Sequence, residues 1–164
     1  MRGRWLCIVF ALVALGATSA QEKKGVAPWF TERVTTTTYD GLIVSASFEQ
    51  QYAKGAADEY WQPTKEDVAA FERGLLAYLK NQPLPHLSKI LLRLSDYKRH
   101  YRGIMAKHKK VLMVSFFFRE NSVVTSGNWE QSVVAVCGGG DQFFRIKYDI
   151  QNVTYYDFWV NAPL

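Results

Sequence analysis

The C-terminal third of the chain, from Val111 to Leu164, most constrains the fold. It consists of short β-branched and aromatic runs, such as VLMVSFFFRE, separated by turns that contain Gly, Asn or Asp. This alternation is typical of an antiparallel meander. A further strand is expected at Tyr97–Met105. We predict the four strands of the meander at Val111–Arg119, Ser132–Cys137, Gln142–Asp149 and Thr154–Val160.

The two faces of the strand at 142–149 are expected to differ. Successive side chains of a strand point to opposite faces of the sheet. One set is apolar throughout and should face the core, whereas the other begins apolar and becomes basic. The core set is Phe144, Ile146 and Tyr148, and the other set is Phe143, Arg145 and Lys147.

One long amphipathic helix is predicted over Trp61–Asn81. Thr64 follows Pro63 and can accept hydrogen bonds from the free N–H groups of the first turn. Apolar side chains then recur at spacings of three and four residues, which places them on one face of the helix: Val68, Phe71, Leu75, Tyr78 and Leu79. A shorter helix is expected at Leu87–Leu94. The fold class is therefore α+β, with one main helix packed on an antiparallel four-stranded meander.

The first twenty residues have the pattern of a secretory signal peptide. Two arginines precede an apolar run of about 11 residues, and Thr18-Ser19-Ala20 fits a small-residue cleavage site. A membrane-spanning helix needs about 20 apolar residues, so no transmembrane anchor is expected. We predict cleavage after Ala20 and a secreted or periplasmic product. The mature part then divides into an extended N-terminal segment, 21–59, and an α+β domain, 60–164.

The segment at 21–59 contains one hairpin signal. Asp40-Gly41 lies between a threonine-rich run, 31–39, and the alternating run Leu42–Phe48. Asp-Gly between two β-prone runs favours a tight turn, because glycine tolerates a positive φ. The alternative is a threonine-rich linker. The sequence thus predicts an additional N-terminal hairpin at this position.

The charge balance excludes few function classes. The chain has 20 Lys and Arg and 15 Asp and Glu, and removal of Arg2 and Arg4 leaves 18 basic side chains. An excess of about three positive charges does not indicate a nucleic-acid partner, so none is expected. We expect a protein or an envelope component as the partner.

Two short segments supply the candidate binding residues. Residues 89–110 hold eight Lys or Arg against Asp96 alone, and an anionic surface would contact Arg99, Tyr101 and Arg102. The alternative is a solvated strand edge on which lysines prevent unwanted pairing.

The second segment is the turn Gly138–Asp141. Its candidate ligand-binding residues are Gly139, Gly140 and Asp141, through backbone N–H groups that meet an anion. The alternative is a turn that needs positive φ, with Asp141 bonded to the backbone.

Several motifs together resemble those of a family of uncharacterised exported bacterial proteins. The resemblance covers residues 60–161 and depends on their order: Tyr60-Trp61-x-Pro63-Thr64, Tyr97-x-Arg99-x-Tyr101-x-Gly103-Ile104, Phe116-Phe117, and Gly139-Gly140-Asp141-x-Phe143-Phe144-x-x-Lys147-Tyr148-Asp149. It implies no known activity. A helix followed by four strands is also similar in topology to cystatin-like and PepSY-like domains.

The cystatin resemblance extends to one short segment. Gln131-Ser132-Val133-Val134-Ala135 is similar to the Gln-x-Val-x-Gly loop that blocks cysteine proteases, with Ala135 in place of the glycine. This similarity implies a protease inhibitor as one alternative function.

Cys137 is the single cysteine of the mature chain and gives the remaining alternative. A catalytic thiolate needs a nearby base and an exposed electropositive site. Cys137 instead ends an apolar run beside glycines, so we expect a small buried hydrophobic residue. The alternative is a hydrolase, or a regulator of one, that uses Cys137 or the Gly138–Asp141 turn. We assign no catalytic residue, no metal site and no cofactor. The favoured function is a non-enzymatic binding domain.

Overall fold

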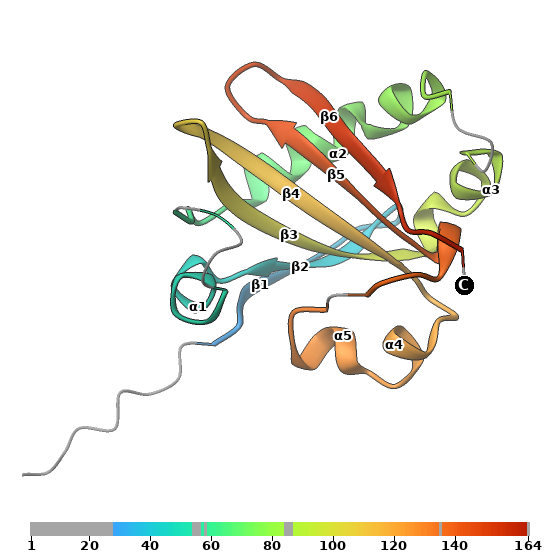
Figure 1. The fold of residues 1–164 in the computed structure, drawn as a ribbon, viewed down its shortest axis with the longest axis horizontal. Helices are drawn as coiled ribbons and strands as arrows, with labels where there is room; N and C mark the ends of the chain where they lie inside the picture. The colour runs from blue at the N-terminus through green and yellow to red at the C-terminus, as the bar shows by residue number, and fades with distance from the viewer. Residues whose placement is uncertain (1–27, 54–56, 58, 84–86, 135, 164) are drawn as a thin grey trace, which may run out of the picture.

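In the computed structural model, the described residues are 28–53, 57, 59–83, 87–134 and 136–163. The predicted signal peptide and its cleavage site lie outside them. Six strands of the described chain form one sheet in the order β1-β2-β3-β4-β5-β6 (Figure 1). Their bounds are β1 Phe30–Thr35, β2 Asp40–Val44, β3 Tyr97–Ala106, β4 Lys109–Phe118, β5 Phe143–Asp149 and β6 Thr154–Val160.

Five α-helices accompany the sheet in the described residues. They are α1 Ala46–Tyr52, α2 Lys65–Lys80, α3 Leu87–Leu92, α4 Ser122–Thr125 and α5 Asn128–Gln131. Two short 3-10 turns, Leu94–Asp96 and Gly140–Gln142, precede β3 and β5. The α+β class is confirmed, but the predicted antiparallel four-stranded meander is only roughly matched: the strands join the N-terminal hairpin in one six-stranded sheet, in which β2 and β3 pair in parallel.

The main helix begins where the sequence predicted its cap. The hydroxyl of Thr64 accepts from the N–H of Asp67, and the carboxylate of Asp67 accepts from the N–H of Thr64 at 2.9 Å. Val68, Phe71, Leu75 and Leu79 are buried on one side of α2. The predicted helix and its apolar stripe are confirmed, with the start at Lys65.

The core lies between α2 and one face of the sheet. Phe71 contacts the aromatic rings of Tyr101 on β3, Phe116 on β4 and Tyr148 on β5. On β5 the side chains of Phe144, Ile146 and Tyr148 are buried in this core, as predicted. Figure 1 shows α2 running behind the strands, while α1, α4 and α5 lie along the lower side of the sheet.

The predicted strand at Ser132–Cys137 is wrong. The chain that leaves β4 forms α4 and α5, and the described residues of 132–137 belong to no strand. The physical reason is that β4 pairs directly with β5, with Phe117 opposite Phe143, so no strand fits between them. The apolar side chain that this segment buries is Trp129 on α5.

The N-terminal hairpin is present, but its turn is shifted. Thr36 and Tyr39 close the turn, where the N–H of Thr36 donates to the carbonyl of Tyr39 at 2.8 Å. Gly41 lies inside β2 and pairs with Arg99 of β3 in the parallel register. A Cβ at Gly41 would lie 2.6 Å from the Tyr101 ring and from the Arg99 carbonyl. Glycine is thus needed there for close strand approach and not for the turn.

The second strand is also shorter than predicted. β2 ends at Val44, and Ser45 then caps α1 by accepting from the N–H of Phe48. The parallel pairing of β2 with β3 places the hairpin in the same sheet as the C-terminal strands.

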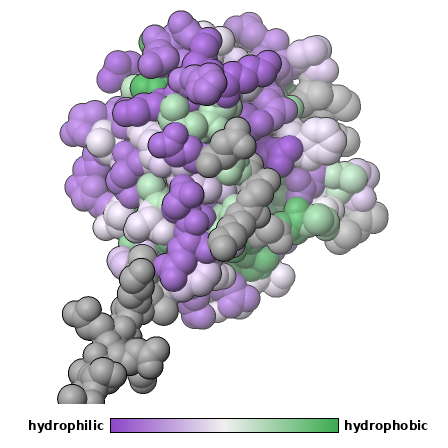
Figure 2. All heavy atoms as spheres, turned by 60° about the vertical axis from the view of Figure 1, so that its left-hand side comes forward, coloured by the Kyte–Doolittle hydropathy of each residue, from purple (hydrophilic) through white to green (hydrophobic). Residues whose placement is uncertain are grey.

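The surface in Figure 2 is mostly hydrophilic, with hydrophobic side chains in separate small patches. In the described residues no helix is both long enough and apolar enough to cross a membrane.

Replacement of Thr64 by alanine tests the helix cap. Thr64→Ala removes the acceptor for the Asp67 N–H and should lower the free energy of unfolding by about 1 kcal/mol. Urea denaturation followed by circular dichroism measures the change. Thr37→Ala, at an exposed turn position, is the matched control and should change it little. Equal stability of both variants would mean that the cap does not hold the helix.

Candidate functional site

A cavity of about 550 Å³ lies between α2, α3 and the β1–β2 turn. Its walls come from segments far apart in the sequence, and the parallel β2–β3 pairing places the β1–β2 turn with Tyr39 beside Arg99. Twelve residues line it: Thr38, Tyr39, Ala69, Glu72, Arg73, Leu75, Leu76, Leu91, Leu92, Leu94, Ser95 and Arg99.

The helix periodicity explains which α2 side chains reach the cavity. Ala69, Glu72 and Leu76 are spaced by three and four residues, so they share one flank of α2. Opposite them, α3 and the following turn contribute Leu91, Leu92 and Leu94. Leu76 is 46% exposed and Leu92 is 86% exposed. The cavity therefore has leucine walls, with apolar surface that the fold leaves open to solvent.

A buried ion pair forms the polar part of the cavity. Nε of Arg99 lies 3.0 Å from Oε1 of Glu72, and their side chains are 1% and 9% exposed. The hydroxyl of Tyr101 donates to the same Oε1 at 2.7 Å. Two charges removed from water need such partners, because each unpaired charge would cost several kcal/mol.

The rest of the Arg99 guanidinium is also held by the protein. Its Nη1 donates to the Tyr97 carbonyl at 2.7 Å, and its Nη2 donates to the Leu94 carbonyl at 3.1 Å. The rings of Tyr39 and Phe116 lie 5.7 and 5.2 Å from its central carbon, within cation–π range. Arg99 is thus fixed by bonds to β3 and to the turn before it.

The pKa directions agree with this arrangement. Burial raises the pKa of Glu72, and the nearby Arg99 and the Tyr101 hydrogen bond partly oppose that change. Burial also raises the pKa of Tyr101 well above its usual value, and the Glu72 carboxylate adds to the effect. Tyr101 therefore remains a hydrogen-bond donor at neutral pH, with Glu72 as its acceptor.

The structure places the predicted binding residues at three separate positions. Arg99 and Tyr101 lie together beside the cavity described above. Arg102 points to the opposite face of the sheet, where it forms an ion pair with the buried Glu49 of α1. Binding by these residues stays a prediction.

The glycine turn lies at the end of the sheet that precedes β5. Gly139 and Gly140 have φ of 87° and 56°, in the left-handed region that favours glycine. The Asp141 carboxylate lies 3.4 Å from Arg93, and its carbonyl accepts from the Tyr97 hydroxyl at 2.6 Å. The glycine conformations and the two Asp141 contacts therefore explain the shape of this turn without a bound anion.

The basic run at 89–110 does not form one surface. β3 is an inner strand between β2 and β4, so the predicted strand edge is wrong. Arg99 points to the face of α2, whereas Lys98 and Arg102 point to the other face, and each has its own acidic partner: Glu72, Asp40 and Glu49. The reason is the two-residue alternation of a strand, which divides neighbouring charges between faces.

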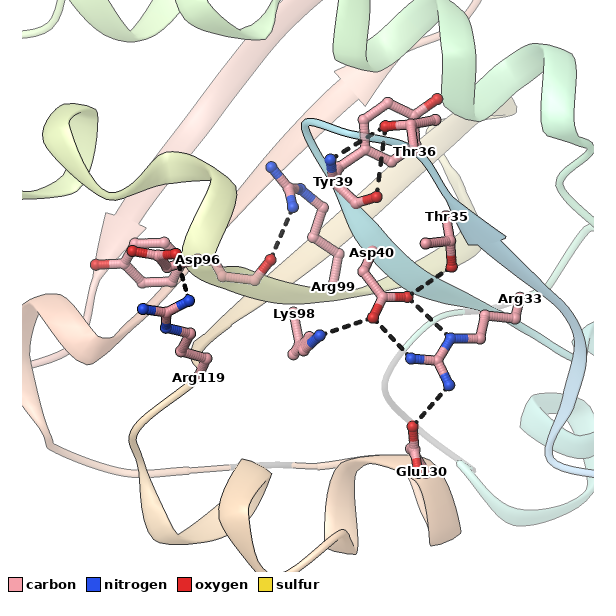
Figure 3. A network of polar contacts seen from close by, with 11 residues as sticks. Arg33, Thr35, Thr36, Tyr39, Asp40, Asp96, Lys98, Arg99, Arg119 and Glu130 are labelled. Atoms are coloured by element: carbon pink, nitrogen blue, oxygen red, sulfur yellow. Dashed lines mark hydrogen bonds and ion pairs between the residues drawn. The ribbon is translucent and has the colours of Figure 1, made fainter.

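Asp40 is the centre of a second polar network, shown in Figure 3. Its carboxylate accepts from Nε and Nη2 of Arg33 at 2.9 and 2.7 Å, and from Nζ of Lys98 at 2.7 Å. Burial by itself would raise the pKa of Asp40, but these donors hold it well below its usual value. Arg33 also contacts Glu130 of α5 at 2.8 Å. The network joins the hairpin, β3 and α5, which is a structural role.

Cys137 is exposed, which corrects the expectation of a buried thiol. The strand expected to bury it does not form. Cys137 lines a cavity of about 440 Å³ together with the glycine turn. Among the described residues, no cluster of three or more His, Cys, Asp or Glu is arranged to hold a metal.

A scan of protein-family models and searches of curated proteins and solved structures found no match for this chain. The resemblance to an exported bacterial family and to cystatin-like or PepSY-like domains therefore stays a prediction.

His100 is a buried titratable group on the face of the sheet opposite α2. Its Nε2 lies 2.7 Å from the Trp129 carbonyl, and its ring packs against Trp29 and Phe117. Burial lowers its pKa to about 4; the Trp129 carbonyl opposes this shift, and the positive charge of Arg102 adds to it. The unfolded imidazole has a pKa of about 6.5. Between about pH 4 and pH 6.5 it is therefore protonated in the unfolded chain and neutral in the folded protein.

Stability should therefore fall as the pH is lowered through this interval. The imidazole contribution is complete above pH 6.5 and is lost progressively toward pH 4, so about 2 kcal/mol should disappear between pH 7 and pH 5. His100→Phe keeps an aromatic ring and should remove most of this dependence in chemical denaturation series. His108→Asn, at an exposed position, should retain it. An unchanged dependence in His100→Phe would contradict this assignment.

Proposed function

We propose that this protein is a non-enzymatic binding domain that holds a small amphipathic molecule in the cavity between α2, α3 and the β1–β2 turn. The observation that supports this most is a buried ion pair, Glu72–Arg99, beside a cavity with leucine walls. Ligand sites are commonly concave and mainly apolar, with a few fixed polar groups that orient the ligand.

The dimensions of the cavity support the proposal. Small-molecule sites usually have volumes of about 300–1,000 Å³, and this cavity has about 550 Å³. Leu76 and Leu92 keep large exposed apolar surfaces at the cavity. A bound aliphatic or aromatic group would remove that surface from water, at about 25 cal/mol for each Å² buried.

Export is part of the proposal. With a signal peptide that ends at Ala20, the ligand would be a molecule of the envelope or of the medium. The expected partner is thus still an envelope component, and it must be small enough to fit the cavity. Protease inhibition through Gln131–Ala135 and chemistry at Cys137 stay alternative predictions; Ala135 lies outside the described residues.

A bulky side chain in the cavity tests the proposal. Ala69→Phe places a ring where the ligand is expected, so affinity for the neutral apolar dye 1-N-phenylnaphthylamine should fall by about tenfold or more. The dye fluoresces when it leaves water, so a fluorescence titration gives the dissociation constant. Ala77→Phe, at an exposed position of the same helix, is the matched control.

Circular dichroism would first establish that both variants are folded. The proposal predicts weak binding by Ala69→Phe and wild-type binding by Ala77→Phe. It would be overturned if the wild-type protein does not bind the dye, or if both variants bind it as the wild-type protein does.

A further inference from the structure

This inference rests on the proposed function and concerns the chemical class of the ligand. The relevant feature is the unequal state of the two charged groups beside the cavity. Oε1 of Glu72 is occupied by Arg99 and Tyr101. No described residue donates a hydrogen bond to Oε2 of Glu72, and this oxygen is not fully buried. The carboxylate therefore presents a free, reachable acceptor to the cavity.

Arg99 offers much less to a ligand. Its Nη1 and Nη2 donate to the carbonyls of Tyr97 and Leu94, and its Nε is buried 3.0 Å from Oε1 of Glu72 as an ion pair without hydrogen-bond geometry. The Arg99 side chain is only 1% exposed. An anionic ligand would have to displace one of these partners and would lie beside the Glu72 carboxylate. Like charges in a poorly hydrated site repel strongly, so anions are disfavoured.

We propose that the ligand is an aliphatic molecule with a protonated amine, which donates to Oε2 of Glu72 while its chain lies along Leu76, Leu91 and Leu92. A charge-assisted bond of this kind is about twice as strong as a neutral one. The leucines provide the apolar surface that an alkyl chain needs, and the amine provides the donor that the free oxygen needs.

The other charged and titratable groups near Glu72 fit this assignment. Arg99 and Tyr101 on β3 hold its other oxygen, and the Tyr39 ring of the β1–β2 turn lies against the Arg99 guanidinium. Arg73 of α2 also lines the cavity, and the hydroxyl of Tyr155 of β6 donates to the carbonyl of Phe71 on α2. Arg73 is exposed, so solvent and salt screen its repulsion of a cation.

Three probes with the same ten-carbon chain separate the possible head groups. Decylamine, decanol and decanoate, each below its micelle concentration, would compete with 1-N-phenylnaphthylamine for the cavity at neutral pH. Decylamine should bind about tenfold or more tightly than decanoate, with decanol between them. Glu72→Gln should abolish this preference, whereas Glu66→Gln, at an exposed position of the same helix, should keep it.

A pH titration of the wild-type protein gives a second measure that needs no variant. Decylamine stays protonated, so its affinity should fall as the pH is lowered through the raised pKa of Glu72. Decanol affinity should change little. This titration retains a test of the inference if Glu72→Gln does not fold.

The outcomes distinguish the two proposals. Equal binding of the three probes, or tighter binding of decanoate, would overturn the amine assignment and leave the apolar cavity as a binding site. A decylamine preference that survives in Glu72→Gln would also overturn the assignment. Failure of the dye and of all three probes to bind would overturn both proposals.

Discussion

The burial of Arg99 is the constraint on which the rest of this structure depends. A guanidinium that is almost fully removed from water must have its partners in place, and these come from several parts of the chain. Glu72 is supplied by α2, the carbonyls come from the chain around the start of β3, and Gly41 of β2 lies against the Arg99 backbone. The helix, the hairpin and the inner strand thus have to assemble together. The cavity lies at their junction.

The sequence correctly predicted those elements whose formation depends on residues close together in the chain. The Thr64 cap and the stripe from Val68 to Leu79 predicted α2, because both depend on residues within one helix. The alternation of Phe144 and Ile146 with Arg145 likewise predicted the two faces of β5. The strand at Ser132–Cys137 failed because its β-branched residues satisfy a local preference, whereas the direct β4–β5 pairing decides where a strand can form.

The candidate site depended on long-range information. Arg99 and Tyr101 were identified from a basic run. Arg102 was grouped with them, but the two-residue alternation of a strand places it on the opposite face. Glu72 was missed because a glutamate on a helix ordinarily faces solvent. Its only signal was its position three residues after Ala69 and three before Leu75, on the edge of the apolar stripe. Glu72 meets Arg99 because α2 packs across β3, and this contact between distant segments is not encoded in any local motif.

The most direct test of a binding site over the Glu72–Arg99 pair is an NMR titration of the folded protein with decylamine that follows leucine methyl and arginine Nε–H signals. Saturable shifts are predicted for the leucines that line the cavity and for the Nε resonance of Arg99, while Leu42 and Leu112, buried elsewhere, should remain unchanged. The cavity leucines are Leu75, Leu76, Leu91, Leu92 and Leu94. Saturable shifts confined to Leu42 or Leu112, or no shift at the cavity leucines, would contradict the account.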